Sequence, residues 1–132
     1  MTTEKRVIEE LSCKNIEGIL ELLPKENRVL VVKFTANWCG PCQRIKDGCY
    51  AMFNQLADNV VVADLNIDFG RNIDVYRMLK RKRQINGIPT LMAWYPDPQR
   101  AFWYVPDDSV VGGDINEIRE FLKRVNQKAI SI

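Results

Sequence analysis

The chain has 132 residues, of which 46% are hydrophobic and 27% are charged, a composition typical of a globular protein with one hydrophobic core. Its 19 basic and 17 acidic residues leave a formal net charge of +2, too balanced to indicate a nucleic-acid-binding or membrane-surface protein. No apolar run approaches the roughly 18 residues of a membrane span, and residues 1–6 lead into no signal-like apolar core. We therefore expect one domain over residues 1–132, cytoplasmic, with no nucleic-acid or membrane partner.

The first predicted elements are a short strand over residues 7–11 and an amphipathic helix. Ser12 or Asn15 can cap this helix, and we expect Pro24 to end it. Its apolar face is formed by Ile16, Ile19, Leu20 and Leu23. Cys13 lies at the preceding turn, where it is either an ordinary thiol or a regulatory or dimer-forming cysteine.

The middle of the chain holds two cysteines between a strand pattern and a helix pattern. Residues 29–34 form an uninterrupted, largely β-branched run typical of a strand buried on both faces. The helical stripe that follows consists of Ile45, Cys49, Met52, Phe53 and Leu56. Residues 38–42, Trp-Cys-Gly-Pro-Cys, are therefore a strand-to-helix turn. We expect Cys49 to pack in the core as a small apolar residue, and the alternative is a second redox function.

This spacing predicts a redox centre. Cysteines three positions apart at a helix start are about one turn apart, close enough for a disulfide. Cys39 would meet the unpaired N–H groups and positive dipole of the helix, which stabilise a thiolate, so it should attack. Cys42, one turn deeper, should resolve the mixed disulfide. Pro41 fits the first helical turn, and Trp38 would wall one side of the exposed sulfur.

The cysteine pair has two other interpretations. Cys-x-x-Cys is also half of a common zinc site, but the chain has no histidine, and Cys13 and Cys49 lack a paired spacing. A purely structural disulfide is the second alternative, disfavoured because a helix start favours thiol reactivity. We therefore expect no metal.

After the predicted redox centre, a strand over residues 60–65 and a helix over residues 72–84 are expected. We expect Ile73, Tyr76 and Leu79 to face inward from this helix. The last turn would carry the basic run 80–83, Lys-Arg-Lys-Arg. Such a run is either a solvated helix end that complements the dipole or a surface that attracts an acidic partner.

A hairpin and a final helix complete the predicted elements. We expect a strand over residues 90–95, a turn over residues 96–99 and a partner strand over residues 102–105. Residues 106–109 would interrupt this second strand before residues 110–113. The hairpin aromatics would pack across the strands or form a protein-binding surface. Asp114 begins a capping box, and the final helix should face inward with Ile115, Ile118, Phe121, Leu122 and Val125.

Three segments together resemble the thioredoxin family, in order and in approximate spacing: residues 38–42, residues 65–68 (Leu-Asn-Ile-Asp) and residues 87–90 (Gly-Ile-Pro-Thr). The resemblance runs from about residue 7 to residue 125. It implies an α/β thioredoxin-like fold, with a central mixed sheet of about five strands flanked by about four helices. It also implies a cis-proline at Pro89 and a substrate groove formed by Trp38, Gly40, Pro41, Ile88 and Pro89, with the Ile88 backbone offered to substrate. On physics alone, only about 5% of such peptide bonds are cis.

The sequence departs from the family at one pair of positions. Thioredoxins usually carry a buried Asp six residues before the first active-site cysteine and a Lys just before the Leu-Asn-Ile-Asp segment, whereas this chain has Lys33 and Asp64 there. If the side chains meet, the ion pair survives in reverse. Proton transfer could then pass to Asp64 or be lost, and Lys33 would lower the thiol pKa values. Otherwise Lys33 points outward and Asp64 caps a strand.

The resemblance implies a protein-disulfide reductase that works through Cys39 and Cys42. The chain has no nucleotide fingerprint or flavin site, so we expect no cofactor, disulfide-containing protein substrates, and an external thioredoxin reductase or other dithiol as electron donor. We expect a monomer. The alternatives are a more oxidising disulfide exchanger, because positive charge near Cys39 stabilises its thiolate, and a partner-binding module that uses residues 80–83 and the extended hairpin 96–109.

Overall fold

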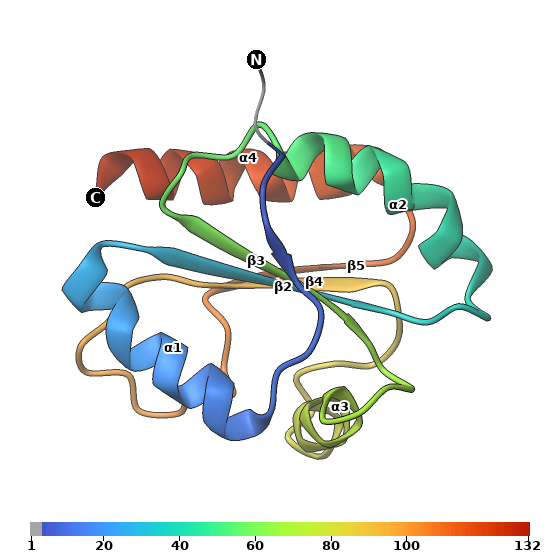
Figure 1. Cartoon of the computed structure of the whole chain (residues 1–132), viewed down its shortest axis with the longest axis horizontal. Coiled ribbons are helices and arrows are strands. Elements are labelled where there is room, and N and C mark those ends of the chain that lie inside the picture. Colours follow the sequence, from blue (N-terminus) through green and yellow to red (C-terminus); the bar gives the residue numbers. More distant parts are fainter. Residues whose placement is uncertain (1–3) are drawn as a thin grey trace.

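The computed structural model describes residues 4–132 and has a mixed five-stranded sheet between two layers of helices (Figure 1). The strands are β1 (Val7–Ile8), β2 (Val29–Thr35), β3 (Val60–Asn66), β4 (Thr90–Trp94) and β5 (Asp108–Val111). The helices are α1 (Cys13–Glu26), α2 (Gly40–Phe53), α3 (Asn72–Arg81) and α4 (Ile115–Ser131). This architecture confirms the predicted fold. Within the described chain, no helix is both long enough and apolar enough to cross a bilayer.

The sheet has the strand order β1-β3-β2-β4-β5, with β2 at its centre. Strands β1, β3 and β2 are parallel, whereas β4 runs antiparallel to β2 and β5 antiparallel to β4. Helices α2 and α4 cover one face, and α1 and α3 cover the other (Figure 1). Val31 packs in the first of these two cores and Val32 in the second. Burial on both faces explains why β2 is apolar from Val29 to Phe34 except at Lys33.

The boundaries of α1 and β1 correct two predictions. Helix α1 is capped by Ser12, as expected, but it continues past Pro24 to Glu26. Proline removes only one hydrogen bond so close to the helix end, and the left-handed Asn27 closes the helix by donating its N–H to the Leu23 carbonyl. The predicted first strand is also shorter, because only Val7 and Ile8 pair with β3.

Helix α3 ends three residues before its predicted end, at Arg81. Its buried residues are Asn72, Val75 and Leu79, so the predicted inward face was right at Leu79 but wrong at Ile73 and Tyr76, which are only partly buried. The Asn72 side chain explains this rotation, because its amide accepts the Leu11 N–H and donates to backbone carbonyls of residues 9 and 66. A polar residue thereby occupies the helix face that the pattern assigned to apolar ones.

The predicted partner strand of β4 was also wrong. Residues 102–105 form no strand, and the strand beside β4 is β5. Residues 95–107 instead form a long loop that is held by its own hydrogen bonds. Arg100 donates to the carbonyls of Tyr95 and Val105 and pairs with Asp107 at 2.7 Å. These local bonds compete successfully with the strand preference of the aromatic residues.

Candidate active site

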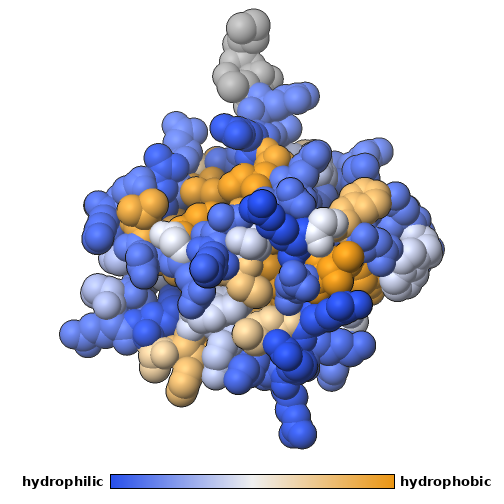
Figure 2. All heavy atoms as spheres, turned by 60° about the horizontal axis from the view of Figure 1, so that its bottom comes forward, coloured by the Kyte–Doolittle hydropathy of each residue, from blue (hydrophilic) through white to orange (hydrophobic). Residues whose placement is uncertain are grey.

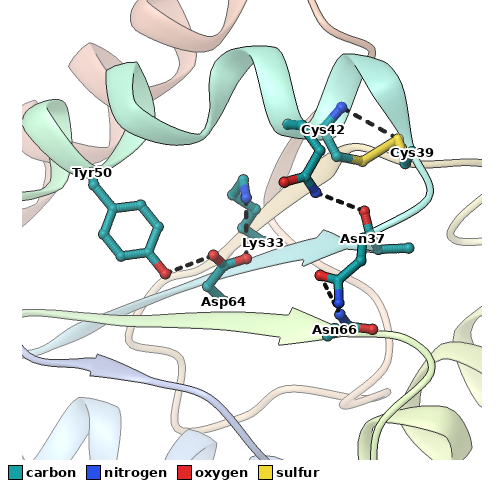
Figure 3. A network of polar contacts seen from close by, with 9 residues as sticks. Lys33, Asn37, Cys39, Cys42, Tyr50, Asp64 and Asn66 are labelled. Atoms are coloured by element: carbon teal, nitrogen blue, oxygen red, sulfur yellow. Dashed lines mark hydrogen bonds and ion pairs between the residues drawn. A yellow bond between two sulfur atoms is a disulfide. The ribbon is translucent and has the colours of Figure 1, made fainter.

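The two cysteines lie where the chain turns from β2 into α2 (Figure 3). Cys39 is the N-cap residue of α2, and its Sγ accepts the backbone N–H of Cys42 at 3.3 Å. Pro41 occupies the first helical turn, where no backbone donor is lost from the helix. Cys39 and Cys42 form a disulfide with their Cα atoms 5.2 Å apart. The cysteine pair thus has the helix-start geometry expected from the spacing.

The first cysteine lies nearer the surface than the second. Cys39 is 6% exposed, whereas Cys42 is fully buried. Ala36 is buried with them, and Ile67 and Ile88 pack against this small apolar cluster. A partner molecule that approaches the disulfide therefore reaches the sulfur of Cys39 before that of Cys42.

The loop before β4 lies beside the disulfide. The Ile88–Pro89 peptide bond is cis, which confirms the conformation that the resemblance implied. The carbonyl oxygen of Ile88 lies 3.9 Å from the Sγ of Cys39. The loop is fixed at both sides, because the Thr90 hydroxyl donates to the Gly87 carbonyl at 2.6 Å and the Gly112 N–H donates to the Pro89 carbonyl at 2.9 Å.

Trp38 projects from the site rather than packing in the core. Its side chain is 69% exposed, and its indole Nε1–H donates to the Asp68 carboxylate at 2.7 Å. Asp68 belongs to the Leu-Asn-Ile-Asp segment, but sequence reasoning assigned it no role at the site. Proximity of that segment to Trp38 depends on the parallel pairing of β2 with β3, which places both strand ends at one edge of the sheet.

Gly113, between β5 and α4, is a second residue that the sequence analysis did not single out. A Cβ added to Gly113 would lie 3.0 Å from the Cβ of Pro41, a tighter contact than most real Cβ atoms make. Glycine therefore lets this loop approach the start of α2 closely. The pair of glycines before the Asp114 cap was the only sequence signal for such an approach.

Lys33 and Asp64 meet beneath α2, as the exchanged-pair hypothesis required (Figure 3). They are direct neighbours across β2 and β3, with Lys33 Nζ 3.1 Å from Asp64 Oδ1. Lys33 is fully buried and Asp64 is 8% exposed. The outward-pointing alternative for Lys33 is therefore wrong.

Tyr50 completes this network from α2, although the sequence analysis gave it no role. Its hydroxyl donates to Asp64 Oδ2 at 2.7 Å, so each carboxylate oxygen has a donor (Figure 3). Burial, followed by the hydrogen bond to Asp64, raises the pKa of Tyr50 well above its usual range. Tyr50 directly follows Cys49, which is buried as predicted. Burial also raises the pKa of the Cys49 thiol to about 11.

Solvent reaches the ion pair from the carboxylate side. A pocket of about 190 Å³ is lined by Asp64 and Tyr50 at one end and by polar side chains that include Asn37, Gln43, Lys46 and Asn66. Lys33 is not part of its lining. The carboxylate is thus the end of the pair that faces the pocket, whereas the ammonium group is enclosed by protein. Among residues 4–132 no cluster of histidine, cysteine or acidic side chains could hold a metal ion.

A disulfide at a helix N-terminus, facing a cis-proline loop on a mixed five-stranded sheet, defines a thioredoxin-fold protein with a redox-active cysteine pair. The thioredoxin family model matches residues 11–123. The chain therefore belongs to the thioredoxin family.

Curated relatives match over part of their length. The thioredoxin-like protein CITRX2, chloroplastic, of Nicotiana benthamiana is 30% identical over 98 residues, which are 74% of this chain and 49% of that protein. Thioredoxin-T of Drosophila melanogaster is 31% identical over 72 residues, 54% of this chain and 42% of that protein. The chain spans about half the length of the curated relatives it matches.

Solved structures are similar over nearly the whole chain. The thioredoxin of Malassezia sympodialis superimposes with a TM-score of 0.73 at 19% identity, covering 96% of both chains. Thioredoxin O1 of Arabidopsis thaliana in its oxidized state gives a TM-score of 0.67 at 22% identity, covering 91% of this chain and 97% of that one. These similarities establish the fold.

Proposed function

We propose that this protein reduces disulfide bonds in other proteins, with Cys39 as the attacking sulfur and Cys42 as the resolving sulfur. The observation that carries the proposal is the place of Cys39 at the N-cap of α2, where its Sγ accepts the Cys42 N–H. A helix N-terminus and a backbone donor both stabilise a thiolate, which is the reactive form. The complete burial of Cys42 suits a sulfur that reacts only within the complex.

The reaction begins from the reduced dithiol. The Cys39 thiolate attacks one sulfur of the substrate disulfide, so that a mixed disulfide forms and the other substrate sulfur leaves as a thiolate that takes up a proton. Cys42 then loses its proton and attacks Cys39 Sγ. The mixed disulfide breaks, the second substrate thiolate leaves, and the internal Cys39–Cys42 disulfide remains. Two electrons thus pass from the protein to the substrate.

The surroundings of the disulfide suggest how a substrate is held. The exposed ring of Trp38 offers an apolar wall on one side, and the Ile88 carbonyl beside Cys39 offers a backbone acceptor. Together with Gly40, Pro41 and Pro89 these residues would form the substrate groove. The Asp68 hydrogen bond would fix the orientation of Trp38 while it does so.

The buried ion pair would tune the potential of the dithiol. Lys33 is fully buried on the central strand β2, in place of the acidic residue usual in the family, so the ammonium and the carboxylate of the ion pair beneath α2 have exchanged strands. Positive charge stabilises a thiolate and so favours the reduced dithiol. The polar pocket gives the Asp64 carboxylate access to solvent, so any proton-transfer role of the pair would fall to Asp64. We infer that this protein is less reducing than a typical thioredoxin. A more oxidising disulfide exchanger is therefore the alternative function.

Electrons must come from outside the chain. We propose that an external thioredoxin reductase or another dithiol protein re-reduces the Cys39–Cys42 disulfide, and that the protein acts as a monomer without a cofactor. A reducing compartment such as the cytoplasm would keep the dithiol ready for use.

A trapping experiment tests the assignment of the two sulfurs. The Cys42→Ser variant, reduced and mixed with insulin, should accumulate a mixed disulfide through Cys39, detectable by mass spectrometry under non-reducing conditions. The matched Cys39→Ser variant should trap nothing, because Cys42 is buried. Wild-type protein with dithiothreitol should precipitate insulin faster than dithiothreitol alone. Trapping through Cys42 would overturn the assignment, and absence of turnover by wild-type protein would overturn the proposed activity.

A further inference from the structure

The loop between β4 and β5 is a preorganised platform. The guanidinium of Arg100 binds the carbonyls of Tyr95 and Val105 and the carboxylate of Asp107. At the base of the loop, the buried Trp94 donates its indole N–H to the Trp103 carbonyl at 2.8 Å. A loop with this many internal bonds loses little conformational freedom when it binds a partner.

This platform presents aromatic side chains beside the end of α3. The rings of Phe102 and Tyr104 lie 5.5 Å apart, and Trp103 meets Tyr104 edge-on at 6.1 Å. Lys82 lies over Tyr104, with Nζ 5.0 Å from the ring centre. Phe102 is 58% exposed. The basic run therefore lies against the long hairpin loop, although Lys82 and Phe102 are 20 residues apart in the sequence.

Lys82, which contacts this aromatic group, belongs to a run of four consecutive cations at the end of α3. Residues 80–83 are all exposed, and in the described part of the chain none of their side chains forms an ion pair. Figure 2 shows the side of the molecule that carries α1 and α3, where hydrophilic residues dominate and hydrophobic ones appear in small groups between them. We call Lys80, Arg81, Lys82, Arg83, Phe102 and Tyr104 the basic-aromatic patch.

We propose that the basic-aromatic patch docks an acidic segment of a partner protein. The carboxylates of such a segment would pair with the unpaired cations, and an apolar side chain between them would pack on the exposed ring of Phe102. Aromatic and basic residues supply the anchors and the electrostatic guidance in protein interfaces. Docking here uses neither sulfur, so it is independent of the proposed reductase activity.

A polypeptide fits this surface better than a nucleic acid does. The four cations occupy about one helical turn, whereas nonspecific nucleic-acid binding uses a groove or stripe of positive charge along several phosphates. Next to Trp103, a groove of about 710 Å³ between α1 and the loop is lined by Glu17, Glu21 and Asp97 together with Lys25 and Arg100. This mixture of charges does not extend the positive surface of the patch, as a long polyanion would require.

Fluorescence anisotropy tests the proposal with a labelled peptide of alternating Glu and Asp around two central leucines. At about 50 mM salt, where surface charges are only partly screened, wild-type protein should bind it. Lys80→Glu combined with Lys82→Glu should weaken binding about tenfold, and Phe102→Ala about threefold. Arg119→Glu combined with Lys123→Glu makes the same change in net charge on α4, at two exposed positions, and should weaken binding less than about twofold.

In the binding assay, the proposal would be overturned by no binding to wild-type protein, by equal weakening in the two charge-reversed variants, or by tighter binding of oligothymidylate than of the peptide. Amide NMR shifts on wild-type protein guard against a variant that misfolds. Peptide-induced shifts should centre on residues 80–84 and 102–104, and shifts centred elsewhere would also overturn the proposal. The Cys39→Ser/Cys42→Ser protein should bind the peptide as wild type does, which separates this test from that of the reductase activity.

Discussion

Replacing Asp64 with Asn should destabilise the protein by about 3 to 5 kcal/mol, the usual cost of breaking a buried ion pair. Lys33 is fully buried, so without a carboxylate partner its amino group would lie in the protein interior with nothing to compensate the cost of its desolvation. The introduced amide would also offer one oxygen to two donors, Lys33 and the hydroxyl of Tyr50. Both effects act in the same direction.

Replacing Lys33 with Met should cost less, about 2 kcal/mol. The Asp64 carboxylate would keep the hydrogen bond from Tyr50 and its contact with the polar pocket, so its charge remains partly compensated. Removing both charges with Lys33→Met/Asp64→Leu should leave stability within about 1 kcal/mol of wild type, because a well-packed apolar pair replaces a buried ion pair at little cost.

Urea denaturation of the oxidised proteins at pH 7 measures these differences, provided that the slope with urea stays constant among variants. The predicted order of destabilisation is Asp64→Asn, then Lys33→Met, then the double variant. If Lys33→Met cost as much as Asp64→Asn, the inference that solvent and Tyr50 compensate the carboxylate alone would be wrong. If the double variant cost the sum of the single ones, the two side chains would not interact.

Two further predictions concern Cys49, beside this network, and Gly113, beside Pro41. The pKa of the Cys49 thiol is raised from 9.0 to about 11 in the folded protein, so the native state binds the thiol proton more tightly than the unfolded chain does. The resulting contribution to the free energy of unfolding is present below about pH 9 and is lost as the pH rises through 11. The loss between pH 9 and pH 11 should be about 2 kcal/mol larger in wild type than in Cys49→Ala, and parallel pH profiles would contradict it. Gly113→Val should destabilise by about 1 to 3 kcal/mol in thermal or urea unfolding, because its side chain would press on Pro41. Gly18→Ala, where nothing lies within 4 Å of the added Cβ, should instead stabilise α1 by about 0.5 to 1 kcal/mol, so destabilisation by both would argue against a specific clash.

The parts of the structure that the sequence predicted well are those encoded in short stretches. The buried strand before Cys39 and the helix after Cys42 follow from an apolar run and a periodic stripe. The exchange of charges at Lys33 and Asp64 was visible because each position is fixed by its distance from a motif. Such features need no knowledge of which distant segments meet.

The parts that the sequence left open depend on contacts between distant segments. Residues 102–105 have the composition of a strand, yet the hydrogen bonds of Arg100 and Trp94 hold them in a loop, and those partners could not be read from the pattern. The link from Trp38 to Asp68 and that from Tyr50 to Asp64 each join two elements of the fold. Nothing in the sequence around a tyrosine in a helix indicates which side chain accepts its hydrogen bond.

The most direct test of tuning by the exchanged ion pair is the equilibrium redox potential of the Cys39–Cys42 pair in glutathione buffers. Alkylation followed by mass spectrometry counts the reduced sulfurs. Because Lys33 places a buried cation beneath α2, we predict a potential some tens of millivolts above the value of about −270 mV that is usual for thioredoxin. Lys33→Met should lower the potential. A wild-type value at or below about −270 mV, or a potential that Lys33→Met leaves unchanged, would contradict the claim that the exchanged ion pair tunes this dithiol.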